Sequence, residues 1–71
     1  MNFEEALESL KDGDKITNLE WNGKGMYLEV QFPNHLSKMT HPYIYICDAQ
    51  GELLPWTPSQ TDLFSKSWKY D

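Results

Sequence analysis

The sequence predicts an α+β fold in which one N-terminal helix packs on a small, mostly antiparallel β-sheet. Residues 3–11 carry apolar side chains at helical spacing, whereas later segments alternate apolar with polar residues or are rich in β-branched and aromatic ones. Turn signals containing glycine, asparagine or proline separate these segments. At a length of 71 residues, we expect a single domain over residues 1–71.

The helix is predicted over residues 3–11. Asn2 is a good N-cap residue, and Glu5 stands three positions later, as a capping box requires. The apolar stripe consists of Phe3, Ala6, Leu7 and Leu10. Gly13 is placed to end the helix.

A hairpin is expected next. Residues 15–20 predict a short strand that is irregular near Asn18. Residues 21–25 (WNGKG) predict the turn, because asparagine and glycine adopt positive φ at low cost, and they place Trp21 near its tip. In residues 26–32, Met, Leu, Val and Phe alternate with Tyr, Glu and Gln, which predicts a strand with one face on the core.

The middle of the chain predicts a loop and a second pair of strands. Residues 33–42 form a polar loop between two prolines, and residues 43–47 (YIYIC) predict a central strand. Residues 48–51 predict a turn, and residues 52–54 a short return strand that stops at Pro55.

The C-terminal part predicts one helical turn and a last strand. Ser59 and Asp62 have the spacing of a second capping box, and we expect Leu63 and Phe64 to turn inward. Residues 67–70 predict a short final strand.

So small a chain has limited surface to bury. A domain of this size buries only about 60% of the surface that its unfolded chain exposes. The single cysteine, Cys47, cannot form a disulfide within the chain, while three tryptophans, four tyrosines and three phenylalanines supply apolar area. Small cores often need a partner subunit, so we expect a homo-oligomer.

The net charge of −5 argues against binding to DNA or RNA polymers, which need a basic surface. A small anionic ligand remains possible. No apolar run approaches the roughly 20 residues of a membrane-spanning helix, and no signal peptide is recognised. A free cysteine fits a reducing compartment, so we expect a cytoplasmic protein.

Catalytic and metal-binding patterns are weak. His35 and His41 lie in the polar loop at a spacing that matches no familiar metal site, and nothing places either beside Cys47. Residues 12–14 (DGD) resemble the start of a calcium loop but lack the later ligands. We expect no enzyme, no metal and no cofactor.

Binding is better supported by the residue types. The tryptophans and tyrosines exceed what so small a core can enclose, and their polar atoms suit a pocket rim. Candidates to bind a base or ribose are Asn22, Ser59, Gln60 and Asp62, and Lys24 with the N–H groups of Gly23 and Gly25 could meet a phosphate. Alternatively, the tryptophans fill the core and a subunit interface while Asn22 only makes the turn.

Three pieces of the sequence resemble a family of small phage and prophage proteins, formerly known only as a domain of unknown function. They are residues 1–7 (MNFEEAL), residues 21–28 (WNGKGMYL), and residues 55–63 (PWTPSQTDL) followed by Trp68. The family includes the Thoeris anti-defence sponges, which bind and sequester the glyco-cyclic isomer of cyclic ADP-ribose.

The resemblance implies an inhibitor that holds a signal made by a TIR-domain enzyme and breaks no bond. It also implies a homo-oligomer, with a tetramer favoured, whose ligand pockets form where subunits meet. Some relatives bind cyclic oligonucleotides, so family membership leaves the ligand open.

Site residues carry over from the two motifs. The resemblance implies that Trp21 stacks on or walls the base, that Asn22 bonds nearby and that Met26 completes an apolar wall. Trp56, Ser59 and Asp62 would lie near ribose or adenine, unless Ser59 and Asp62 serve only as a helix cap. Lys24 joins this set as the cation for phosphate.

Two departures bear on the ligand. Relatives tend to have basic residues shortly before the equivalent of Trp21, where this chain has TNLE at residues 17–20, and the loop over residues 33–42 is short. The rival functions are a sponge for cyclic di- or trinucleotides, a small inhibitor that binds a host protein through an aromatic surface, and a hydrolase of the signal. The last is disfavoured because no nucleophile–base pair is evident.

Overall fold

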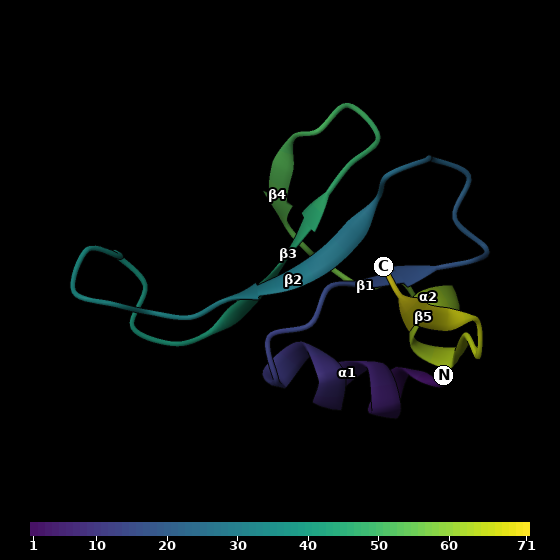
Figure 1. Ribbon diagram of the computed structural model, residues 1–71, viewed down its shortest axis with the longest axis horizontal. Helices are drawn as coiled ribbons and strands as arrows, with labels where there is room; N and C mark the ends of the chain where they lie inside the picture. The colour runs from purple at the N-terminus through teal and green to yellow at the C-terminus, as the bar shows by residue number, and fades with distance from the viewer.

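The computed structural model describes residues 1–71. Its elements, in chain order, are α1 (Phe3–Lys11), β1 (Ile16–Asn18), β2 (Tyr27–Gln31), β3 (Tyr43–Cys47), β4 (Leu53–Pro55), α2 (Gln60–Phe64) and β5 (Trp68–Tyr70) (Figure 1). The predicted α+β class is confirmed, with a second short helix beside the N-terminal one.

The five strands form one antiparallel sheet in the order β4-β3-β2-β1-β5. β2 and β3 pair along their whole length, from Tyr27↔Cys47 to Gln31↔Tyr43. β5 returns from the end of the chain to pair with β1, and the N–H of Trp68 donates to the carbonyl of Met1 at 3.1 Å. The two ends of the chain therefore meet at the β5 edge of the sheet.

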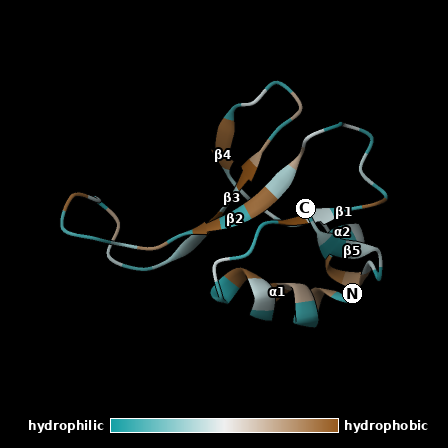
Figure 2. Ribbon diagram, viewed as in Figure 1, coloured by the Kyte–Doolittle hydropathy of each residue, from teal (hydrophilic) through white to brown (hydrophobic).

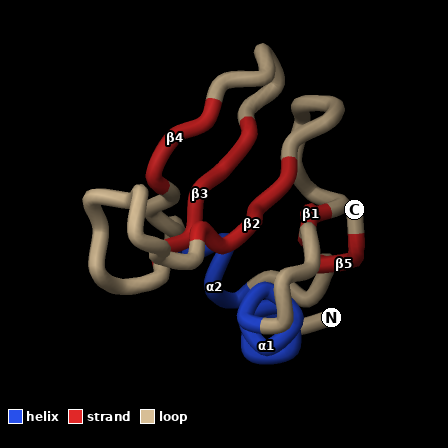
Figure 3. The backbone as a smooth tube through the Cα atoms, turned by 60° about the vertical axis from the view of Figure 1, so that its left-hand side comes forward, coloured by secondary structure: helices blue, strands red, loops and turns tan.

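α1 has the predicted bounds because its ends are specified locally. The Asn2 side chain accepts a hydrogen bond from the N–H of Glu5, and the Glu5 carboxylate accepts one from the N–H of Asn2. α1 lies along one face of the sheet, as its end-on view in Figure 3 shows. Its apolar side packs into a core of five fully buried residues: Ala6, Leu10, Ile16, Leu28 and Trp68.

The connection between β1 and β2 differs from the predicted tight turn. Asn22 and Gly23 do not have positive φ, and in this loop only Gly25 does, at 77°. The chain instead turns directly after β1, at Asn18. The side-chain oxygen of Asn18 accepts a hydrogen bond from the N–H of Glu20, and its main-chain carbonyl accepts one from the N–H of Trp21. The expectation that Trp21 sits at a hairpin tip is therefore wrong, because the residue lies next to the turn and packs inward.

Three smaller expectations also need correction. Phe64 is 80% exposed, because the inner side of the one-turn helix α2 is occupied by the indole of Trp68, which donates to the carbonyl of Asp62. Leu63 is also exposed. Pro55 is the last residue of β4, whereas the sequence predicted that the strand stops before it. Proline is tolerated there because β4 is an edge strand, and a residue on its outer side has no neighbouring strand to donate an N–H to.

Residues 32–42 connect β2 to β3 and project away from the rest of the molecule (Figure 1). We call this segment the arm. Its tip is ordered by hydrogen bonds between Asn34 and Ser37, while Leu36 and Met39 face solvent. Hydrophobic colouring therefore appears on β3 and β4 and again on the arm (Figure 2). Neither helix has the length and apolar character that a membrane crossing requires.

Candidate functional site

Trp21 and Trp56 both pack against a third tryptophan, Trp68. The rings of Trp21 and Trp56 each meet Trp68 edge-on, at centroid distances of 5.4 and 6.0 Å. Phe3 contacts both Trp56 and Trp68, at 5.8 and 5.7 Å. Trp68 is fully buried and contacts both of the other indole rings, so it anchors them to the core.

Trp21, Ser59 and Asp62 come together through bonds within the chain. The Trp21 Nε1–H donates to Oδ1 of Asp62 at 3.2 Å, and Oδ2 of the same carboxylate accepts from the N–H of Ser59 at 2.9 Å. The Ser59 hydroxyl accepts from the N–H of Asp62 in return. This is the capping box that the sequence predicted, and it ties the start of α2 to the loop after β1.

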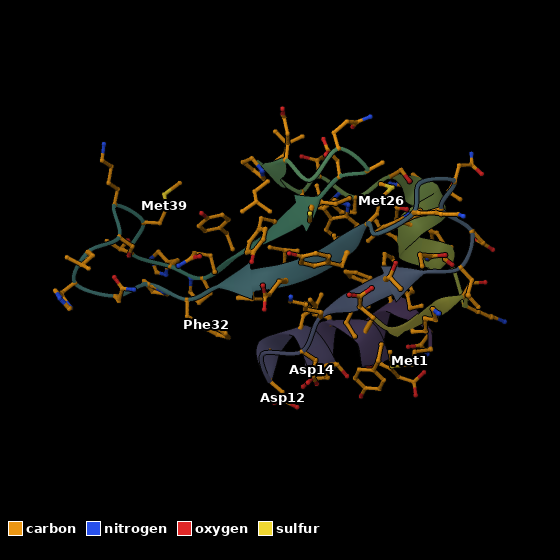
Figure 4. The ribbon with its side chains drawn as sticks, turned by 45° about the horizontal axis from the view of Figure 1, so that its top comes forward. Met1, Asp12, Asp14, Met26, Phe32 and Met39 are labelled. Carbon is orange, nitrogen blue, oxygen red and sulfur yellow. The ribbon has the colours of Figure 1, made fainter.

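Met26 lies at the end of the molecule away from the arm (Figure 4), and Asn22 and Lys24 precede it in the loop between β1 and β2. The side chains of Asn22 and Lys24 are exposed and make no hydrogen bond or ion pair within the chain. Met26 is half-buried beneath Gly23, where a Cβ would come within 2.4 Å of the methionine sulfur and 3.0 Å of the Ala49 Cβ. Gly23 is thus closely packed by its neighbours, and its φ is not positive.

A groove of about 780 Å³ runs between α1 and the sheet. From α1 it is lined by Phe3, Leu7 and Lys11, from the sheet by Val30, Tyr43 and Ile44, from the arm by Phe32, His41 and Pro42, and from the segment after β4 by Trp56 and Pro58. Phe32 projects from the end of β2 to the side on which α1 lies (Figure 4). Among the predicted site residues, the structure brings only Trp56 to this groove.

The groove differs in charge from the rest of the chain. The chain has eleven acidic residues, but none of them lines the groove, and residues 30–47 contain no aspartate or glutamate. Its ionisable side chains other than Tyr43 are Lys11 and His41. Lys11 also meets Glu8 at 3.5 Å, with both side chains more than 60% exposed. The groove therefore combines aromatic walls with cationic or neutral polar groups.

Sequence reasoning missed most of these lining residues. Two signals point to them in retrospect: Phe3, Leu7 and Lys11 recur at intervals of four on one helix face, and Val30 and Phe32 share the strand face of buried Leu28. What the sequence does not reveal is that β2 and β3 extend beyond the part of the sheet that α1 covers closely, so that an open groove remains.

On the face of the sheet away from α1, two tyrosines contact residues of the same chain. The Tyr45 hydroxyl donates to the Glu29 carboxylate on the neighbouring strand, and this bond raises the pKa of Tyr45 to about 12. Burial, followed by a bond to Cys47, raises the pKa of Tyr27, while the Lys15 ammonium lies 4.7 Å from the centre of the Tyr27 ring. No three His, Cys, Asp or Glu side chains gather closely enough to hold a metal ion.

Comparison with known proteins covers nearly the whole chain. The model of the Thoeris anti-defense 2-like domain family matches residues 1–70. Thoeris anti-defense 2 from Bacillus phage SP01 is 33% identical over 81 aligned positions, which cover 96% of this chain and 91% of the relative. The similarity thus includes both motif segments and every residue of the groove.

Proposed function

Because the chain belongs to the Thoeris anti-defense 2-like family, and so has a phage anti-Thoeris function, we propose that it acts as a sponge. In this proposal it binds a signalling nucleotide of the cyclic ADP-ribose type and withholds it from the effector. The ligand is held and released unchanged, without catalysis.

The groove between α1 and the sheet is the observation that carries the proposal. Nucleotide pockets combine flat apolar walls with a few polar groups that fix the orientation of the ligand. Phe3, Trp56 and Tyr43 supply aromatic surface, and Lys11 and His41 supply donors. A lining without carboxylates suits a ligand that carries two phosphates, even though the whole chain has a net charge of −5.

The residues of the first motif take a different place in the proposal. Asn22, Lys24 and Met26 lie outside the groove. Trp21 does not line it either, and packs against Trp68. We propose that they meet the ligand across a subunit contact, in a homo-oligomer for which the family resemblance favours a tetramer. Ser59 and Asp62 act mainly by holding Trp21 and the start of α2.

The sponge proposal is tested by capture and recovery. The purified chain is mixed with glyco-cyclic ADP-ribose, free ligand is separated by filtration, and the retained fraction is heated and analysed by mass. We expect ligand to be retained in proportion to protein and recovered intact. Ligand recovered in altered form would make the protein an enzyme, and ligand that passes the filter at micromolar protein would reject capture of this nucleotide.

Two alternatives are read from the same experiment. Retention of cyclic di- or trinucleotides in place of cyclic ADP-ribose would keep the sponge mechanism and change its ligand. The exposed Leu36 and Met39 on the ordered arm favour a different candidate, an inhibitor that binds a host protein. That candidate predicts retention of no nucleotide, and a loss of anti-Thoeris activity in cells when both side chains are changed to serine.

A further inference from the structure

We infer that the groove is polarised along its length, with one end built for a flat ring and the other for phosphate. This assignment rests on the proposed function and specifies how its ligand would lie. On the α1 wall, Phe3, Leu7 and Lys11 follow one another at intervals of four residues. Eight residues of helix span about 12 Å, so Phe3 and Lys11 mark two separate ends.

The ring end is formed by Phe3 and Trp56, whose ring centres are 5.8 Å apart and whose planes are inclined by 41°. The main-chain N–H of Trp56 donates to the carbonyl of Ile44, which fixes this end beside the second residue of β3. The indole N–H groups of Trp21 and Trp68 are both engaged with Asp62, whereas that of Trp56 makes no hydrogen bond within the chain. The ring end therefore offers an aromatic surface together with a free donor.

The phosphate end lies toward the arm. Val30 pairs with Ile44 near the ring end, and the strands continue from there to Phe32 on one side and His41 on the other. Here the last turn of α1 brings Lys11 into the lining, and no carboxylate lines the groove with it. Lys11 and His41 thus approach one end of the groove from opposite walls.

The contact between Lys11 and Glu8 does not block this role. Both side chains are exposed, and exposed ion pairs of this kind contribute little free energy. A phosphate offers a stronger partner, because it carries more charge and several acceptor oxygens. Glu8 then acts as a competitor for Lys11, and its charge opposes the ligand.

The chemical class that fits is a nucleoside with phosphate on its 5′ side. Its base would lie at Phe3 and Trp56, and its phosphates at Lys11 and His41. This polarity predicts opposite effects for two neighbouring residues on one helix, which a purely structural role of α1 would not produce.

The test measures binding of glyco-cyclic ADP-ribose and of adenosine to the full chain and its variants by calorimetry. For the cyclic nucleotide we expect Lys11→Gln to weaken affinity about tenfold, as the loss of a charged hydrogen bond does, and Glu8→Gln to strengthen it. Adenosine, which lacks phosphate, should bind both variants as it binds the wild type. Lys66→Gln is the matched control, because this exposed lysine lies outside the groove.

The outcomes separate the two proposals. A wild-type chain that binds no nucleotide overturns the sponge proposal and this assignment with it. A wild-type chain that binds the cyclic nucleotide, with affinity unchanged in both Lys11→Gln and Glu8→Gln, leaves the sponge in place and overturns the polarity. Equal weakening in both variants, with far-UV circular dichroism altered, would assign α1 a structural role only and also overturn it.

Discussion

At the scale of single residues, the three tryptophans have different tasks although the sequence presents them as one class. Trp68 is fully buried and donates to the carbonyl of Asp62, and Trp21 is anchored by the Asp62 carboxylate. Trp56 lines the groove, and its indole N–H has no partner within the chain. The residue type predicted that the indole N–H groups would find hydrogen-bond partners. It did not predict which contact each one makes. The partner of Trp21, for example, is Asp62, which lies 41 positions away in the sequence.

Tyr45 provides a prediction about pH. Its hydroxyl donates to Glu29, and its pKa is raised to about 12 from an ordinary value near 10. A folded-state pKa above the unfolded value stabilises the fold fully below pH 10, and this contribution is lost as the pH rises through 12. We expect Tyr45→Phe to cost about 1 kcal/mol at pH 7.

Urea unfolding at pH 7, 9 and 11 checks this prediction. The difference in unfolding free energy between wild type and Tyr45→Phe should stay constant to pH 9 and shrink at pH 11. A difference that does not change with pH over this range would contradict the assignment of the raised pKa to this bond.

Gly23 provides a prediction about packing. An added Cβ would meet the Met26 sulfur and the Ala49 Cβ, so Gly23→Ala should lower the unfolding free energy by about 1–2 kcal/mol through overpacking. Thermal unfolding measures the loss. Adding Ala49→Gly removes one of the two contacts and should restore part of the stability, whereas additive losses in the double variant would show that the loop does not pack on the turn after β3.

At the scale of elements, local rules predicted what local contacts determine. Both helices begin at the expected capping boxes, and β3 has the expected bounds. The loop after β1 departs from expectation because the Asn18 side chain and the packing of Gly23 outweigh the turn preference of Asn22-Gly23. The groove could not be predicted, since its walls come from four segments whose arrangement depends on the register of the sheet.

The second capping box predicts a difference between its two members. Ser59→Ala removes the cap and should cost about 1 kcal/mol of unfolding free energy. Asp62→Ala removes the reciprocal bond and also the acceptor of Trp21, so we expect about 2 kcal/mol. Chemical denaturation compares the two variants. Equal losses would mean that the bond between Trp21 and Asp62 contributes nothing to stability.

At the scale of the whole molecule, a small core coexists with a large amount of exposed apolar surface. Five residues form the fully buried cluster, while Leu36, Met39, Leu53 and Phe64 are exposed on the arm, β4 and α2. These exposed side chains are consistent with the homo-oligomer that we propose, because a second copy would bury some of them. The oligomer would also bring the loop of Asn22 and Lys24 to a neighbouring groove.

The central claim is that the nucleotide lies in the groove between α1 and the sheet. Its most direct test is the ¹H–¹⁵N spectrum of the three indole N–H groups during titration with glyco-cyclic ADP-ribose, with each signal assigned by a Trp→Phe variant. We expect the Trp56 signal to move most, because this residue lines the groove and its indole N–H makes no hydrogen bond within the chain. A Trp56 signal that stays in place at saturation while the Trp21 signal moves would contradict the account and place the ligand at the loop after β1.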